Sequence, residues 1–302
     1  SKSLSLIGES GSGVVIDASG NNTSYGISVQ ADNVTLKNFT LLPPTDGNTP
    51  PTAGAYAIHA SFNHGTTPYE PYSNLTLENI TIENGYRTGF DIHGYDGVTL
   101  TNLSSRNAAW GNGITLTGCT DFTVTGCTTE DNAWGGIAFY ASNSSYLNRG
   151  SSGTFDMAAN SIGEGTAYVE DEFGLENSVT VNGAGYLIYN PYSEPDAEML
   201  MYTDQDQATA ETIAGGLNTK YGNTLSTIED LATGDYIVAG GLSLQAAIDA
   251  ASDGATINIG AGTYDETLNI ENRTDLTLSG ADRDNVIIQS STTLPWDFGG
   301  FW

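Results

Sequence analysis

Stretches in which apolar and polar residues alternate recur along the first part of the chain, a pattern that predicts half-buried β-strands. They read NVTLKNFTL from Asn33, NLTLENITI from Asn74, GVTLTNLSS from Gly97, DFTVTGCTT from Asp121 and SVTVNGAGY from Ser178. The stretches at positions 74, 97 and 121 are spaced by 23 and 24 residues. This period suits one turn of a three-sided β-solenoid, with about seven residues on each side.

A second repeat sets the register of these turns. The stretches 83–94, 106–118 and 131–142 superpose as ENGYRTGFDIHG, RNAAWGNGITLTG and DNAWGGIAFYAS. The superposition predicts that one turn position is shared by Asn84, Asn107 and Asn132. It also predicts that the side chains of Phe90, Ile114 and Ile137, each of which follows a glycine, point inward. Stacked turns would then bury columns of similar residues.

These repeats resemble the right-handed parallel β-helix proteins of the pectate-lyase-like superfamily. The resemblance covers residues 1 to about 190 and again 243 to 290, and it implies an all-β, three-sided parallel β-helix. We expect the β-helix over 1–190. Two segments interrupt the repeat and are predicted insertions: 43–73, rich in Pro, Gly and Tyr, and 144–176, rich in Gly, Ser and acidic residues.

The chain after residue 190 changes character. Residues 191–242 place Ala, Glu and Leu at helical spacings and predict a partly helical connector. Residues 243–302 begin with a predicted amphipathic helix that has Ser243 as its N-cap. The helix is followed by residues that alternate between apolar and polar, as in strands, and then by an aromatic tail. In the superfamily a segment of this kind begins the β-helix and caps it. Residues 273–289 also match residues 1–17 without a gap, so we predict a β-helix start or cap module.

An uncovered first turn would expose unpaired strand edges, which template pairing with other chains. Three arrangements would cover it: the module closes on its own chain, it caps a neighbour in a head-to-tail fibre, or the chain is a piece of a tandem array. We therefore expect a homo-oligomer or polymer. The predicted assembly residues are Leu4, Leu6, Leu244, Ile248, Trp296, Phe298 and Trp302.

The charge balance narrows the choice of partners. The 36 acidic and 8 basic residues give a formal charge of −28, which disfavours nucleic acids and anionic membranes. Such a surface suits high salt or an extracellular, cell-surface setting. A polyanionic polysaccharide would need cations to intervene, which makes Ca²⁺ a possible cofactor, although no EF-hand loop is present. No apolar run reaches transmembrane length. No signal peptide is visible, so the sequence is a mature chain, a fragment or an intracellular protein.

The two cysteines and the asparagines leave alternatives open. Cys119 and Cys127 lack zinc-site spacing, and they are either buried thiols or a disulfide. No metal site is predicted. Nine Asn-x-Ser/Thr sequons occur, but several arise from the strand repeat itself, so glycosylation stays open.

Three residues form the candidate catalytic group: Arg87, Asp91 and His93. Asp91 and His93 are two residues apart and so lie on one face of a strand, which is the outward face if Phe90 and Ile92 point inward. Arg87 lies on the preceding turn, and a long loop containing His59 and His64 would overhang this face. The group suits general acid–base chemistry; the alternative is a solvated face with a local Asp–His hydrogen bond.

An aromatic column is predicted at one turn of three successive rungs, formed by Tyr86, Trp110 and Trp134. If this column is exposed, sugar rings could stack on it; if it is covered, it would hold an insertion in place.

Two classes of function follow. The sequence favours an extracellular structural or adhesive β-helix that self-assembles through its C-terminal module. The alternative is a carbohydrate-active enzyme (a polysaccharide lyase or glycoside hydrolase) or a non-catalytic polysaccharide-binding module.

Overall fold

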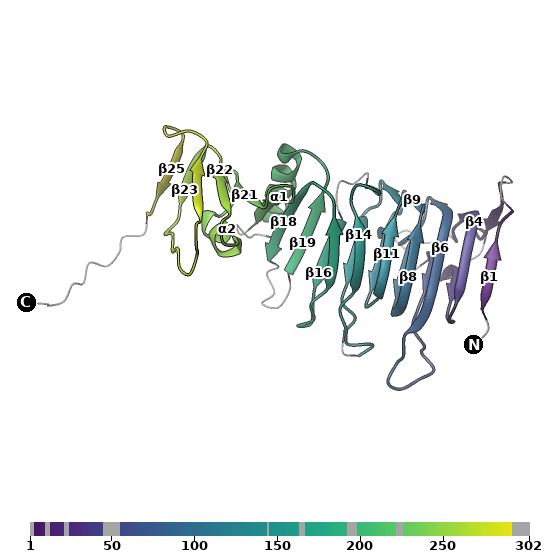
Figure 1. Ribbon diagram of the computed structural model, residues 1–302. Helices are drawn as coiled ribbons and strands as arrows, with labels where there is room; N and C mark the ends of the chain where they lie inside the picture. The colour runs from purple at the N-terminus through teal and green to yellow at the C-terminus, as the bar shows by residue number, and fades with distance from the viewer. Residues whose placement is uncertain are drawn as a thin grey trace, which may run out of the picture. The chain divides into compact units, whose positions relative to one another are not determined.

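The computed structural model of the chain describes residues 3–9, 13–20, 24–44, 55–143, 145–162, 167–191, 198–221 and 226–291 (Figure 1). The chain divides into two compact units. The first unit consists of Ser1–Gly185 and Glu194–Gln205, and the second of Tyr186–Ser193 and Asp206–Trp302.

The first unit is a three-sided parallel β-helix, in which each turn of the chain supplies three strands. One turn contains β8 (Tyr95–Thr101), β9 (Ser104–Arg106) and β10 (Asn112–Thr117), and the next contains β11 (Thr120–Thr125), β12 (Thr128–Glu130) and β13 (Gly135–Tyr140). Each strand pairs in parallel with its equivalent one turn away. The three-sided solenoid expected from the 23- and 24-residue spacing is therefore present.

Strands of equivalent position form the three sides of this β-helix. The first side contains β1 (Leu4–Ile7), β4 (Val34–Leu42), β6 (Tyr72–Glu83), β8, β11, β14 (Ser152–Asp156) and β17 (Ser178–Asn182). The second side contains β2 (Val15–Asp17), the C-terminal halves of β4 and β6, β9, β12 and β15 (Ser161–Ile162). The third side contains β3 (Tyr25–Val29), β5 (Tyr56–Ala60), β7 (Phe90–His93), β10, β13 and β16 (Ala167–Asp171), with β19 (Glu198–Thr203) antiparallel to β16.

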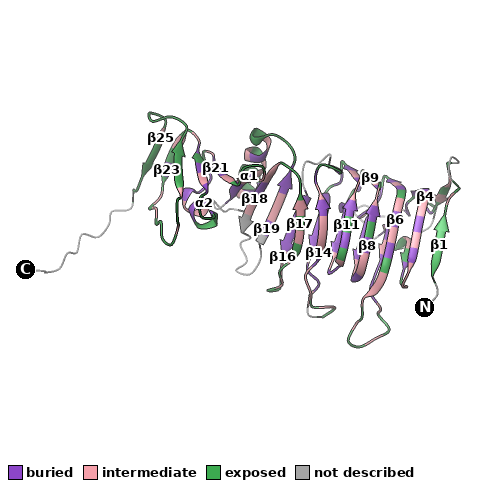
Figure 2. Ribbon diagram, viewed as in Figure 1, coloured by how far each residue is buried: buried purple, intermediate pink, exposed green. Residues whose placement is uncertain are grey.

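The core is built from columns of apolar residues in register across the turns (Figure 2). On the third side, one column runs through Ile58, Phe90, Ile114 and Ile137, all of them fully buried. The predicted inward positions are thus confirmed. Because burying one such side chain contributes roughly 1.5–3 kcal/mol, these columns supply the main driving force for stacking.

Asparagines hold the turns in a left-handed backbone conformation, which is accessible to Asn at little cost. One series, Asn38, Asn79 and Asn102, has φ between 52° and 62°. The Asn79 amide donates to the Asn38 amide oxygen at 2.9 Å, and the Asn102 amide donates to that of Asn79 at 3.1 Å. Such a ladder satisfies the side chains and ties each turn to the next.

The predicted asparagine column at positions 84, 107 and 132 needs one correction. Asn84 and Asn107 are equivalent and hydrogen-bonded, but the third left-handed residue is Asp131. Asn132 is buried instead, where its side chain accepts from the Ala108 amide and donates to the Ser105 carbonyl. The pairing registers give the turn between β9 and β10 one residue more than the turn between β12 and β13, which displaced the alignment.

Both predicted insertions contain strands of the β-helix, so their bounds were too wide. Segment 43–73 includes β5, and segment 144–176 includes β14, β15 and β16. The alternation is hidden in β14 because Gly153 occupies one of its two inward positions, the other being Phe155. A Cβ atom there would lie 2.4 Å from the Phe122 side chain of the preceding turn. One large ring therefore fills the space of two side chains.

The two cysteines are free and buried, so the disulfide alternative is not realised in the structure. Each Sγ lies near backbone carbonyls, 3.4 Å from Ile92 O for Cys119 and 3.9 Å from Leu100 O for Cys127. Burial raises the pKa of both thiols to about 11. They act as small apolar residues of the core.

The second unit combines two helices with short strands: β18 (Tyr186–Pro191), α1 (Gln207–Tyr221), β20 (Thr227–Asp230), β21 (Asp235–Val238), α2 (Leu244–Ala250), β22 (Thr256–Ile259), β23 (Gly262–Asp265), β24 (Thr277–Gly280) and β25 (Val286–Gln289). β18, β20 and β21 pair antiparallel. β22 pairs in parallel with β24, and β23 with β25. These two pairs stack one turn of the chain on the next. The assignment of this segment as a β-helix start or cap module stays a prediction.

The start of α2 is fixed as the sequence predicted. The Ser243 side chain accepts from the Ala246 amide at 3.1 Å. Glu266 adds its carboxylate to the same helix end, where it accepts from the backbone amides of Leu244 and Gln245. The connector 191–242, expected to be partly helical, contains α1 together with the strands β19, β20 and β21.

The predicted assembly residues fall into three groups. Leu4 and Leu6 are exposed on β1. Leu244 and Ile248 are fully buried within the second unit, so they are wrong as interface residues. Trp296, Phe298 and Trp302 lie outside the described residues. Head-to-tail assembly, self-closure and the tandem array stay predictions. Neither described helix is long and apolar enough to cross a membrane.

Replacing Asn79 will test the ladder. Asn79→Ala loses the two amide hydrogen bonds of the ladder and places in a left-handed turn a residue that adopts this conformation less readily than Asn, so we expect a loss of about 2–3 kcal/mol. Asn79→Gly keeps the turn accessible and should cost only about 1 kcal/mol. Denaturant unfolding measures both values. Equal stability of the two variants would show that the backbone conformation contributes nothing.

The cysteines provide a second test. Because both thiols are buried and protonated at neutral pH, a thiol-specific reagent should label neither in the folded protein and both after denaturation. Rapid labelling of the folded chain at pH 7–8 would contradict the described burial. Absence of any labelling after denaturation without a reductant would indicate a disulfide.

Candidate functional site

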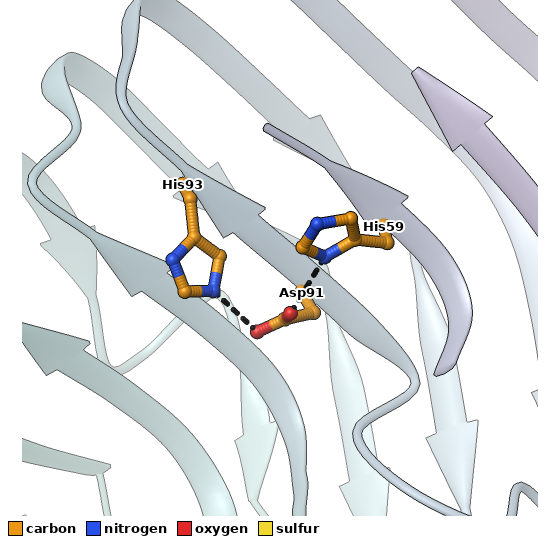
Figure 3. A group of neighbouring side chains, drawn as sticks. All are labelled: His59, Asp91 and His93. Carbon is orange, nitrogen blue, oxygen red and sulfur yellow. Dashed lines mark hydrogen bonds and ion pairs between the residues drawn. The ribbon is translucent and has the colours of Figure 1, made fainter. Parts of the chain in front are cut away.

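Three ionisable side chains meet on the outward face of the third side. His59 of β5 lies opposite Asp91 of β7 in the parallel register, and His93 follows Asp91 by two residues on the same face. His59 Nδ1 lies 2.8 Å from Asp91 Oδ2, and His93 Nε2 lies 3.0 Å from Asp91 Oδ1. Figure 3 shows the carboxylate between the two imidazoles. We call these residues the His–Asp–His cluster.

The cluster is electrostatically coupled. Burial alone would raise the pKa of the Asp91 carboxyl, but the charge of His93 and hydrogen bonds from both imidazoles outweigh it and lower that pKa well below its usual range. Burial alone would lower the pKa of His93, yet the charge of Asp91 and its hydrogen bond raise it. Asp91 is thus a carboxylate, and each of its two oxygens is hydrogen-bonded to one imidazole.

Arg87 lies between two aromatic rings beside this cluster. Its guanidinium carbon is 4.8 Å from the centre of the Tyr56 ring and 5.9 Å from that of Trp134. Both distances are within the range of cation–π attraction. Burial, followed by the charge of Asp91, raises the pKa of Tyr56 to about 12, although Arg87 opposes the shift. Tyr56 therefore stays a neutral phenol.

Arg87 and Asp91 line a pocket of about 180 Å³, which we call the Arg87 pocket. The other lining residues are Tyr56, Thr88, His93, Asn112, Thr115, Thr117, Trp134 and Tyr140. Asn112 organises one wall of the pocket, since its amide donates to Tyr140 and its oxygen accepts from Tyr168 at 2.8 Å. The pocket thus offers hydroxyl and amide groups around one guanidinium.

A larger pocket of about 290 Å³ adjoins it, and the two share His93 and Thr117. We call it the Tyr25 pocket. Tyr25 stacks on His59 with ring centres 4.6 Å apart. Phe62 and Tyr146, whose ring centres are 5.5 Å apart, come from loops after β5 and β13 and wall this pocket. The two pockets extend the candidate site along the third side.

Residues 7–190 match the family model described as the right handed beta helix region. The chain belongs to this family. The match spans nearly all of the first unit and includes every residue of both pockets, so the predicted right-handed parallel β-helix is confirmed. No curated protein and no solved structure matches the chain.

The β-helix brings the predicted catalytic residues together, but with different surroundings. Arg87, Asp91 and His93 share one pocket, and the expected Asp–His hydrogen bond is present. Asp91 is buried, however, and does not lie on a solvated face. His59 belongs to strand β5 and not to an overhanging loop, while His64 hydrogen-bonds Ser61 outside the cluster.

His59 is the residue that the sequence reasoning missed as a site member. Its strand reads AYAIHASF, in which alternate residues are apolar as in the other strands. The insertion 43–73 hid this signal because the spacing to the neighbouring repeats is irregular. No sequence spacing links positions 59 and 91, so the metal-ligating potential of the cluster was also missed.

The predicted aromatic column does not form. Trp110 pairs with Arg87 of the previous turn and not with Tyr86. The backbone amide of Trp134 donates to the carbonyl of Gly111 and not to that of a residue paired with Trp110. Trp134 lines the Arg87 pocket, whereas Trp110 is not among the residues lining either pocket. Tyr86 is half-buried. The extra residue in the turn after Asn107 moves these aromatics out of line.

The lining residues limit the chemistry. Asp91 is the only carboxylate lining either described pocket, and glycoside hydrolysis by paired carboxylates needs two. The pocket is instead suited to recognising a polar ligand with an apolar face. It offers the exposed indole of Trp134, the guanidinium of Arg87 and several neutral hydrogen-bonding groups.

Proposed function

We propose that this β-helix binds an acidic polysaccharide along the outward face of the third side, with one uronic acid unit in the Arg87 pocket. The observation that carries the proposal is the Arg87 guanidinium between Tyr56 and Trp134, in a pocket otherwise lined mainly by hydroxyl and amide groups. The Tyr25 pocket would receive the adjoining sugar unit.

The lining groups support a sugar ligand in particular. Trp134 is 50% exposed, so its ring offers the apolar surface on which a sugar ring stacks. The hydroxyl of Thr117, which is half-buried and lines the pocket, would hydrogen-bond a sugar hydroxyl. Burial raises the pKa of Tyr140 far above its usual range, so its hydroxyl stays neutral and remains hydrogen-bonded to Tyr168 and Asn112 in the pocket wall.

The Arg87 guanidinium favours an acidic unit. Arg87 is one of only eight basic residues in a chain of formal charge −28, and a uronate carboxylate would pair with it bidentately. Repulsion from the acidic surface would be weaker at raised salt, because salt screens exposed charges beyond about 10 Å. An extracellular or cell-surface setting, where such polysaccharides occur, is part of the proposal.

Paired tryptophan variants test the proposal. Trp134→Ala should weaken binding of a hexuronic acid oligomer about tenfold, a loss of about 1.4 kcal/mol, because it removes the stacking surface. Trp110→Ala is the matched control, since Trp110 is 46% exposed but is not among the residues lining either pocket, and its affinity should equal that of the wild type. Isothermal titration calorimetry measures both affinities.

Arg87 separates acidic from neutral ligands in the same assay. Arg87→Gln should weaken binding of the hexuronic acid oligomer but change that of the matching neutral hexose oligomer little. The proposal is wrong if the wild type does not bind the acidic oligomer. It is also wrong if Trp110→Ala lowers the affinity for that oligomer as much as Trp134→Ala does.

A further inference from the structure

We infer that His59, Asp91 and His93 form a binding site for a divalent transition-metal ion, with Zn²⁺ as the representative case. The inference is independent of the proposed polysaccharide, because it rests on the His–Asp–His cluster alone. The ligand atoms of these three side chains all lie within 4.8 Å of one another.

The donor set selects the class of ion. Two imidazole nitrogens and one carboxylate suit borderline metals such as Zn²⁺, Fe²⁺, Co²⁺ and Ni²⁺. Ca²⁺ and Mg²⁺ prefer sets composed of oxygen atoms. The two nitrogen ligands therefore distinguish the cluster from a calcium site, and we do not expect Ca²⁺ to compete with a transition-metal ion for it.

The separations already approach those of a coordinated ion. Zinc bonds to nitrogen and carboxylate oxygen are about 2.0–2.2 Å long, so two ligand atoms at the tetrahedral angle on one ion lie about 3.4 Å apart. The contacts from Asp91 to His59 and His93 are 2.8 and 3.0 Å. An ion would replace the protons that these contacts now share, and the two imidazoles would close around it.

The fold holds the ligands in place without the ion. His59 and Asp91 are Cα partners in neighbouring strands, and Tyr25 stacks on the His59 ring with an interplanar angle of 14°. The Asp91 side chain is only 5% exposed. Fixed ligands lower the entropic cost of binding, so such an arrangement favours affinity.

The cluster also leaves an open side. Asp91 and His93 line the Arg87 pocket, and His59 and His93 line the Tyr25 pocket. An ion with three protein ligands at this junction keeps at least one coordination position for water or for a ligand oxygen. Three protein ligands and one open position are typical of catalytic zinc sites and not of structural ones.

The test is a metal titration of the full chain after removal of metals with a chelator. Zn²⁺ is titrated against a chromophoric competitor, with Ca²⁺ in excess to occupy surface carboxylates, and Co²⁺ is added in parallel to record its visible absorption. We expect one equivalent of Zn²⁺ to bind with a dissociation constant of micromolar or lower, and a Co²⁺ spectrum of low coordination number.

His93→Ala is the decisive variant, because His93 is the most exposed of the three ligands (31% of its side chain) and its removal is least disruptive. We expect at least a hundredfold loss of Zn²⁺ affinity. His64→Ala is the matched control: it removes the third histidine of the chain, which bonds Ser61 outside the cluster, and should bind Zn²⁺ as the wild type does.

Asp91→Asn provides a second readout that does not depend on removing a ring. The amide keeps the shape and a hydrogen bond but lacks the charge, so Zn²⁺ binding should fall while circular dichroism confirms the fold. Loss of the Zn²⁺ signal in excess Ca²⁺, or equal Zn²⁺ affinity of the His93→Ala and His64→Ala variants, would overturn the inference. Neither outcome bears on sugar binding.

Discussion

The parallel register of stacked turns determines which residues of this protein become neighbours. Each strand hydrogen-bonds to its equivalent one turn away, so residues that are 23, 24 or 32 positions apart in the chain lie side by side. Apolar columns fill the interior, and left-handed asparagines fix the corners. The candidate site depends on this constraint, because only the parallel register brings His59 beside Asp91, 32 residues further along the chain.

The outward face of the third side differs from the rest of an acidic chain. Two imidazoles bond one buried carboxylate, and Arg87 lies in the same pocket between the rings of Tyr56 and Trp134. The same parallel stacking that buries Phe90 and Ile92 turns Asp91 and His93 outward. Neighbouring turns then contribute tyrosines, threonines and Asn112 to the lining of two adjoining pockets.

Regular repeats made the fold predictable from the sequence, and irregular turns made the site harder to predict. Apolar alternation, with glycines at fixed spacing, was enough to place β6 to β13. The strands β5 and β14 were missed, because a long segment precedes β5 and Gly153 replaces an apolar residue in β14. One additional residue before Asn112 misaligned Asn132 and the tryptophans. Long-range neighbours such as His59 require the three-dimensional register.

The asparagine ladder also restricts how such a chain can be made. Asn74, Asn79 and Asn102 begin Asn-x-Ser/Thr sequons, and each side-chain nitrogen already donates to the asparagine of the previous turn. An oligosaccharide attached there during synthesis would occupy that nitrogen and remove its hydrogen bond to the previous turn. Production in a host that glycosylates secreted chains would therefore compete with folding, whereas bacterial cytoplasm imposes no such conflict.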